Sequence, residues 1–195
     1  LFVLVSAPSM NFAQAPTLGT TADFVLFTSI GAVGNTGSSK LTGNIGTDNG
    51  AIAGCGNVNG VMHNSNGATF AAAADLLIGY NQLNSAIPNF SHAPLLGNGD
   101  TLIAGVYAIA GNASLNLNLY LDAEGDSNAV FIFQISGALS TGAASKVVLL
   151  NGAQACNVFW KTEDLVSIAS NTIMRGTIVA NNAAISISSG ATLEG

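Results

Sequence analysis

The sequence predicts a mostly β protein, built as a β-solenoid with one long α-helix packed alongside it. Three observations favour this fold. Segments near the C-terminus repeat at a fixed spacing, the repeated segments alternate apolar and polar residues, and one Ala/Leu-rich stretch interrupts the strands. A fixed repeat is typical of stacked coils, because each coil can bury its apolar side only against its neighbours.

The repeat has a spacing of 19 residues. Residues 166–170 (VSIAS) match residues 185–189 (ISISS), and the same offset aligns Met174 with Leu193. A further step of 19 back from Val166 reaches Val147, and residues 177–179 follow 19 after residues 158–160. We therefore expect three successive coils to share one register.

Alternation within the best coil assigns its two sides. Ile185 and Ile187 are expected to face the core, and Ser186 and Ser188 to face water. Stacking would place Ser167 beside Ser186 at the strand spacing of about 4.8 Å. The Gly/Asn-rich turns 151–154, 170–173 and 189–192 are expected to align as corners, since Gly and Asn tolerate the positive φ of tight turns.

Residues 69–86 form the Ala/Leu-rich stretch, which ends before Pro88 and predicts a helix of four to five turns. An apolar stripe at three- and four-residue steps is expected to lie against the solenoid, and comprises Phe70, Ala73, Leu77, Tyr80 and Leu83 or Asn84. Strands are expected again from Thr101 onward.

Composition limits the partners. Charged residues make up 7% of the 195 residues and the net charge is −6, which disfavours nucleic acid and anionic lipid. No uncharged apolar stretch is long enough for a membrane span. The length suits one domain, expected to be a monomer.

The first fifteen residues differ from the rest. An apolar run, Leu1 to Val5, precedes small and polar residues ending in Ala13-Gln14-Ala15. This pattern indicates the remnant of a signal peptide at residues 1–15, cleaved after Ala15, with the mature domain at 16–195. An apolar first strand is the alternative. We expect the mature protein to be secreted.

Enzymatic chemistry has little support. His63 and His92 lack a nucleophile motif or a zinc motif, and the alternating Asp122, Glu124 and Asp126 lack the spacing of a calcium loop. We predict no enzyme, no cofactor and no metal site. Cys55 and Cys156 could form a disulfide in an exported chain, or remain buried thiols.

Several motifs resemble the microbial ice-binding (antifreeze) family over roughly residues 17–195. They are 18–24 (LGTTADF), 74–77 (ADLL), 95–97 (LLG), 102–107 (LIAGVY), 121–134 (LDAEGDSNAVFIFQ), 151–160 (NGAQACNVFW) and 190–195 (GATLEG). The resemblance implies a right-handed, discontinuous β-solenoid with a flanking helix. It also implies a further strand beyond residue 195, so the C-terminus is expected to be truncated.

The resemblance further implies a flat face of short polar residues that binds ice. The family's loose Thr-(Ala/Gly)-x-(Thr/Asn) pattern is matched most closely by 189–192 (SGAT), and in its first two positions at Thr36 and Thr141. The candidate ice-binding residues are Ser167, Ser170, Thr172, Ser186, Ser188, Ser189, Thr192, Thr141 and Thr36. The expected function is adsorption to ice, giving thermal hysteresis or inhibiting recrystallisation. The alternative is an extracellular adhesive or matrix module.

Overall fold

The computed structural model describes residues 13–35, 40–55 and 58–195. Most of the predicted signal-peptide remnant, and Thr36, lie outside the described residues. The described residues divide into two compact units, Pro16–Gln82 and Leu83–Gly195. We call them the N-terminal and C-terminal units.

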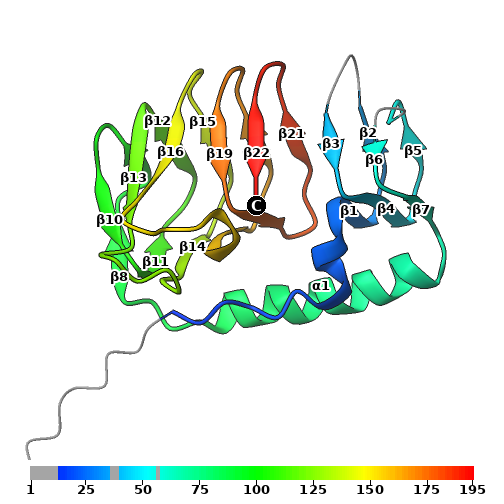
Figure 1. The fold of residues 1–195 in the computed structure, drawn as a ribbon, viewed down its shortest axis with the longest axis horizontal. Helices are drawn as coiled ribbons and strands as arrows, with labels where there is room; N and C mark the ends of the chain where they lie inside the picture. Colours follow the sequence, from blue (N-terminus) through cyan, green and yellow to red (C-terminus); the bar gives the residue numbers. More distant parts are fainter. Residues whose placement is uncertain (1–12, 36–39, 56–57) are drawn as a thin grey trace, which may run out of the picture. The chain divides into compact units, whose positions relative to one another are not determined.

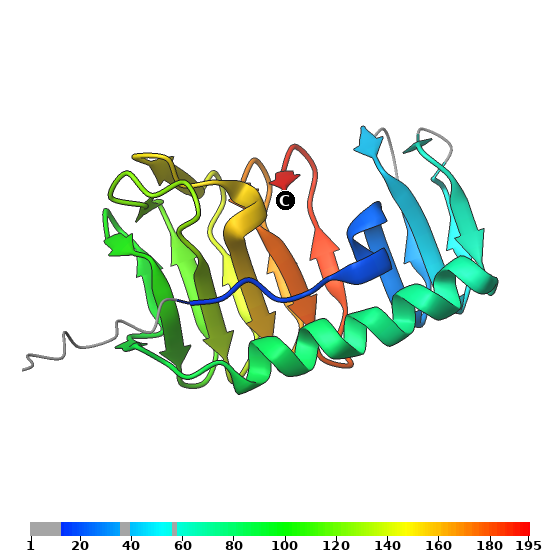
Figure 2. The ribbon, with the colours of Figure 1, turned by 60° about the horizontal axis from the view of Figure 1, so that its bottom comes forward.

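The C-terminal unit consists of five stacked coils, each contributing one strand to each of three parallel sheets (Figures 1 and 2). The helix-side sheet contains β8 (Phe90–His92), β11 (Gly105–Ile109), β14 (Phe131–Ile135), β17 (Val158–Thr162) and β20 (Thr177–Ala180). The serine sheet contains β9 (Leu95–Gly97), β12 (Ala113–Asn116), β15 (Leu139–Thr141), β18 (Val166–Ile168) and β21 (Ile185–Ile187). The charged sheet contains β10 (Thr101–Ile103), β13 (Asn118–Asp122), β16 (Lys146–Leu150), β19 (Ile173–Arg175) and β22 (Thr192–Glu194). The predicted solenoid is confirmed.

The 19-residue repeat holds for the last two coils only. Val166 pairs with Ile185, and Met174 with Leu193, as expected. Val147, however, lies in β16 of the charged sheet, while Val166 pairs with Leu139 at an offset of 27. The prediction of three coils in one register was therefore wrong. The coils are longer here because residues 123–130 and 151–157 extend one corner.

A second register correction concerns β17 and β20. Phe159 pairs with Thr177, an offset of 18 rather than 19. Three residues (163–165) connect β17 to β18, whereas four (181–184) connect β20 to β21. The additional corner residue changes the offset from 18 to 19 between one sheet and the next.

The turn alignment also needs correction. Asn171 N donates to Ser189 O at 3.3 Å, so two of the three predicted turns do stack. The turn at 151–154 stacks instead on the corner after β13, where Gly125 N donates to Asn151 O at 2.9 Å.

A stack of aromatic side chains runs through the C-terminal core, buried at Tyr107, Phe133 and Trp160 and 38% exposed at Phe90. The rings of Phe90, Tyr107, Phe133 and Trp160 follow one another with centroid distances of 4.9, 5.4 and 4.0 Å. Each comes from a successive strand of the helix-side sheet, so the stack crosses four coils and fixes their spacing. Ile185 and Ile187 follow Val166 and Ile168 in register but are 42% and 40% exposed, because β21 is the last strand of its sheet.

The N-terminal unit repeats the architecture with fewer strands. One sheet contains β1 (Phe24–Ile30), β4 (Asn44–Asn49) and β7 (Met62–Asn64); two pairs contain β2 (Val33–Gly34) with β5 (Ile52–Ala53), and β3 (Leu41–Thr42) with β6 (Val58–Asn59). A short 3-10 helix, Gly19–Asp23, precedes β1.

The predicted helix is α1 (Gly67–Ser85). Asn66 Oδ1 caps it by accepting from Ala68 N at 3.1 Å and Thr69 N at 3.2 Å. Asp75, within the helix, accepts from Thr20 N and Thr20 Oγ1, both at 2.7 Å, and these bonds lower the pKa of its carboxyl. No helix among the described residues is long and apolar enough to cross a bilayer.

The apolar stripe predicted for α1 was assigned partly to the wrong side. Phe70 is 74% exposed and Leu77 59% exposed, whereas Thr69, Ala72 and Leu83 are fully buried. Apolar residues occur all around this helix, so their pattern leaves its rotation undetermined.

Neither cysteine forms a disulfide. Cys55 is a buried thiol whose Sγ lies 3.4 Å from Ala53 O, in agreement with the buried-thiol alternative. Cys156 is also free but lies exposed in the 3-10 helix Ala155–Asn157, so neither alternative holds for it.

Candidate functional site

The three sheets of the C-terminal unit present different outer surfaces. The helix-side sheet is covered: Val106, Ile132 and Phe159 alternate with the core residues, yet are at most 3% exposed. Gln134 Nε2 donates to Leu83 O and Ala86 O, both at 2.7 Å, which fixes the end of α1 on this sheet. A large flat ligand therefore cannot reach its strands.

The charged sheet is open but carries ionic and bulky groups. Its outward residues include Asp122, Lys146, Arg175 and Glu194, and the bulky Tyr120 lies on β13, the second strand of the sheet. Arg175 Nε lies 3.0 Å from Glu194 Oε2, forming an ion pair on the surface. This surface resembles that of an ordinary soluble domain.

The serine sheet is open and uncharged. Ser114, Ser140, Ser167 and Ser186 pair in register on four neighbouring strands, and the last three are exposed. Leu95, 45% exposed, continues the row on β9. None of the residues that the structure describes in these five strands is charged. The row has the spacing of the backbone, about 4.8 Å per strand.

Uncharged side chains, most of them small, flank the serine row on both sides. Leu139 N donates to Leu165 O and Val166 N to Ala184 O, so residues 138, 165 and 184 form a parallel row before the strands. This row reads Ala138, Leu165, Ala184. After the strands, Ser188 N donates to Ile168 O at 2.9 Å, placing Ser188 beside Ala169 as the repeat predicted. The row before the strands thus carries aliphatic side chains, whereas the row after them contains both Ala169 and Ser188.

Of the predicted site residues, Ser167 and Ser186 lie in the serine row. Ser188 and Ser189 are exposed at the corner after β21, and Ser170 is half-buried at the matching corner. These five residues share one side of the C-terminal unit.

The predicted threonines do not join them. Thr172 is fully buried; its Oγ1 lies 3.0 Å from Thr141 Oγ1 and donates to Gly142 O at 3.2 Å. Thr141 Oγ1 also accepts from Ala169 N, so both hydroxyls form hydrogen bonds that stabilise the corners. Thr192 is exposed but lies in β22 of the charged sheet, and Thr36 lies outside the described residues.

Ser114 and Ser140 were not predicted. They belong to the longer coils, at offsets of 26 and 27 to the next serine, so a fixed step of 19 passes over them. A search for an apolar residue followed by Ser and then by an apolar residue or Thr, allowing insertions, would have found ASL, LST, VSI and ISI.

Other polar clusters have local partners. Asp122 accepts from Glu124 N at 2.8 Å and from Asn151 Nδ2, and thereby closes the extended corner. His92 Nε2 lies 3.8 Å from Asp100 Oδ2, and His63 Nδ1 lies 3.2 Å from Asn66 Nδ2. Over residues 13–35, 40–55 and 58–195, no three His, Cys, Asp or Glu residues converge as metal ligands.

The fold and this surface define a class: a three-sided parallel β-solenoid with a flanking helix and an uncharged, serine-lined sheet. The Ice-binding-like family matches residues 27–195, and the chain belongs to this family. The resemblance predicted from the sequence is confirmed.

Relatives and solved structures agree. An ice-binding protein from Nostoc sp. (strain HG1) is 36% identical over 171 residues, covering 86% of this chain and 63% of the relative. The crystal structure of an ice-binding protein from an Antarctic Flavobacteriaceae bacterium has 62% identity and a TM-score of 0.90, covering 92% of this chain and 43% of that one. A domain of ice-binding protein 1 from Shewanella frigidimarina has 31% identity and a TM-score of 0.84, covering 94% and 91%.

The chain spans 63% of the Nostoc relative, 43% of the Flavobacteriaceae chain and 12% of the whole Shewanella protein. These relatives are ice-binding proteins and not enzymes, so the prediction of a non-enzymatic protein is confirmed.

Proposed function

We propose that this protein adsorbs to ice through the outer surface of the serine sheet. The carrying observation is the in-register row of Ser114, Ser140, Ser167 and Ser186 on an uncharged, open sheet. The names of its relatives support ice as the ligand. Adsorption at this surface would lower the freezing point or slow recrystallisation.

The physical argument concerns ordered water. A lattice surface is periodic, so a protein surface matches it over a large area only if its own groups are periodic and rigid. Parallel strands supply a repeat of about 4.8 Å, and the buried aromatic stack beneath holds that repeat in place. Hydroxyl groups can donate and accept within a water lattice, while the neighbouring methyl groups exclude disordered water.

Charge is the second part of the argument. Ionic side chains hold their hydration shells strongly and impose water orientations that differ from those of ice. The described residues of the serine sheet present none, whereas Lys146, Arg175 and Glu194 occupy the charged sheet. Of the two open sheets, the serine sheet is therefore the one suited to ice.

The test is freezing hysteresis and ice-crystal shaping with the purified chain. A gap between melting and freezing points, together with faceted crystals, is the expected result. A folded protein that leaves freely growing, rounded crystals and no gap would refute the proposal.

We also propose that the protein is secreted and acts as a monomer. The apolar run and Ala13-Gln14-Ala15 support cleavage after Ala15, which predicts exported protein starting at Pro16. N-terminal sequencing and sedimentation of the exported protein test both points. Retention inside the cell with residues 1–15 still attached would contradict secretion.

An adhesive module is the second candidate. It is favoured by one observation, that the matching Shewanella protein is far longer than this domain. An adhesive module would hold cells expressing the whole protein to a surface without shaping ice crystals. Crystal shaping by the isolated chain therefore separates the two functions.

A further inference from the structure

Lys161 is the only charged residue that is buried among those the structure describes, at 4% exposed. It lies on β17, on the outer side of the helix-side sheet, next to Trp160 of the core. A buried ammonium is costly unless it is paired and hydrogen-bonded, so its partners show what it holds together.

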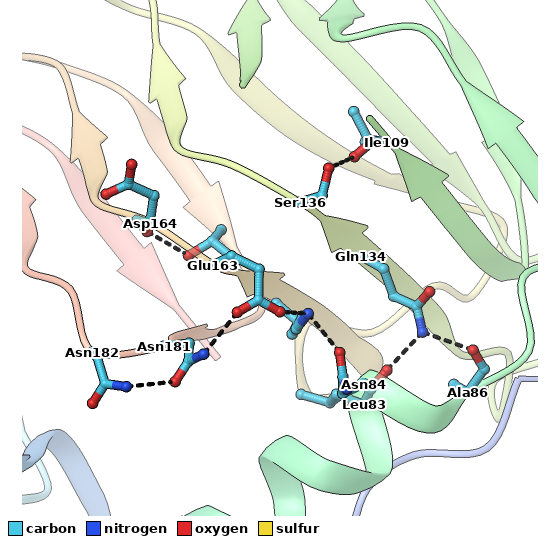
Figure 3. A network of polar contacts seen from close by, with 12 residues as sticks. Leu83, Asn84, Ala86, Ile109, Gln134, Ser136, Glu163, Asp164, Asn181 and Asn182 are labelled. Atoms are coloured by element: carbon cyan, nitrogen blue, oxygen red, sulfur yellow. Dashed lines mark hydrogen bonds and ion pairs between the residues drawn. The ribbon is translucent and has the colours of Figure 1, made fainter. Parts of the chain in front are cut away.

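The partners come from three separate segments (Figure 3). Lys161 Nζ donates to Asn84 Oδ1, in the last turn of α1, at 2.7 Å. It also pairs with Glu163 Oε1, and Glu163 Oε2 accepts from Asn181 Nδ2 at 2.7 Å. The backbone reinforces the last contact, since Asn181 N donates to Thr162 O at 2.9 Å.

Two of these partners stand immediately before the serine sheet. Glu163 begins the three-residue corner into β18, and Asn181 begins the four-residue corner into β21. The carboxylate of Glu163 thus joins two corners of unequal length, whose strands carry Ser167 and Ser186 in register. Backbone bonds join the two corners at their ends, from Asn181 N to Thr162 O and from Val166 N to Ala184 O, and the Glu163 carboxylate adds the side-chain link between them.

The equivalent corners of two earlier coils are held without charge. Gly111 N donates to Ser136 Oγ at 2.8 Å, and Ala138 N donates to Asn112 Oδ1 at 3.0 Å. Both are direct bonds from the backbone of one corner to a side chain of the other. The charged network is therefore confined to the corners leading to β18 and β21.

We infer that Lys161 and Glu163 are positioning residues for ice binding, which set the relative height of Ser167 and Ser186 without themselves touching ice. This inference rests on the proposed function. The ammonium of this pair is buried, whereas the Glu163 side chain is 31% exposed. An ion pair with a buried member adds little stability compared with apolar residues of similar size, but it demands one geometry. Its role is to align the two serine-bearing strands.

The experiment compares Lys161→Met with the double variant Lys161→Met/Glu163→Gln. The single variant leaves Glu163 without its cation and should lower the melting temperature, whereas the double variant removes both charges and should recover much of that loss. If the pair positions the serines, hysteresis at equal concentration should fall at least about twofold in both variants, because a site whose supporting residues are lost becomes imprecise. Glu194→Gln, which breaks the Arg175 ion pair on the charged sheet, is the matched control and should leave hysteresis unchanged.

Hysteresis that recovers in the double variant together with the melting temperature would overturn the inference, since the pair would then be only stabilising. Amide hydrogen exchange gives a readout that does not depend on ice. Val166 N and Ser188 N, which bond across β18 and β21, should exchange faster in both variants, while Ala113 N should not change. Unchanged exchange at Val166 and Ser188 would equally overturn the inference. A wild-type protein without hysteresis would refute the proposed function and leave this exchange comparison to decide the positioning.

Discussion

The serine sheet and the charged sheet belong to the same five coils but differ in the chemistry of their outer surfaces. Both are parallel, open to solvent and backed by the same apolar core. One places serines in register, and the other places Lys146, Arg175 and Glu194 among bulky groups. The periodic backbone is therefore not sufficient for an ice-matching surface. The outward side chains distinguish the sheet that we propose for ice binding from the charged sheet.

Replacing a serine of the serine row with a residue that carries a large ring should reduce thermal hysteresis more than any other change. Ser167→Tyr places an aromatic ring in the middle of the serine row, so most of the hysteresis should be lost. Because Ser167 is exposed, the free energy of unfolding should change by no more than about 0.5 kcal/mol. Hysteresis and thermal unfolding measured on the same sample check both points.

Thr192→Tyr is the matched variant on the charged sheet. Thr192 is equally exposed and lies in the neighbouring sheet of the last coil, so its replacement should leave hysteresis nearly unchanged. Loss of hysteresis in Thr192→Tyr with retention in Ser167→Tyr would transfer the ice-binding surface to the charged sheet.

A single charge should have the next largest effect. Ser140→Lys adds an ammonium at the centre of the serine row, and its hydration shell should reduce hysteresis without abolishing it. Thr101→Lys adds the same charge to the exposed start of β10, where ionic residues already occur nearby, and should have little effect. Equal losses in the two variants would show that net charge matters and its position does not.

The sequence predicted the solenoid, the helix and part of the serine row because these depend on local patterns. Ile185-Ser186-Ile187 alternates strictly, and the 19-residue step from Val166 to Ile185 is uninterrupted. Ser114 and Ser140 were missed because the extensions at 123–130 and 151–157 change the coil length without disturbing the strands. Insertions at a corner affect the spacing along the chain and leave the stacking intact.

The threonines show a different limit. Thr172 follows the corner residues Ser170 and Asn171 and is a hydroxyl residue like its neighbours, so composition alone assigns it to the surface. In the structure it is fully buried and bonded to Thr141, which lies 31 residues earlier in the chain. Such a pair becomes visible only once the coils are in register.

Alkaline pH should destabilise the serine sheet and the charged sheet together, because it acts on the core that both sheets share. Burial raises the pKa of Tyr107 to about 12, against an ordinary value of 10.0, and its hydroxyl donates to Ile103 O at 2.7 Å. The folded state favours the neutral form of Tyr107. Its contribution to the folding stability is therefore complete below pH 10 and is lost as the pH rises through about 12. Unfolding followed by Trp160 fluorescence should show this loss.

Tyr107→Phe provides the control for that titration. It removes one buried hydrogen bond and should cost about 1 kcal/mol at neutral pH. The variant should lose less folding stability than the wild type at alkaline pH, because its ring can no longer ionise. An identical alkaline profile in the variant would assign the effect to other groups.

The smallest expected effect is a gain. Leu165 is 48% exposed and lies between Ala138 and Ala184 in the row beside the serines, where it is the one large side chain. Leu165→Ala should flatten that row and raise hysteresis modestly, with a stability change within about 0.5 kcal/mol. Ile103→Ala removes a comparably exposed aliphatic group, 42% exposed, from the charged sheet and should leave hysteresis unchanged. If Leu165→Ala instead lowers hysteresis, the apolar contact area of Leu165 contributes more to adsorption than flatness does, and the serine sheet binds ice as much through its hydrophobic row as through its hydroxyls.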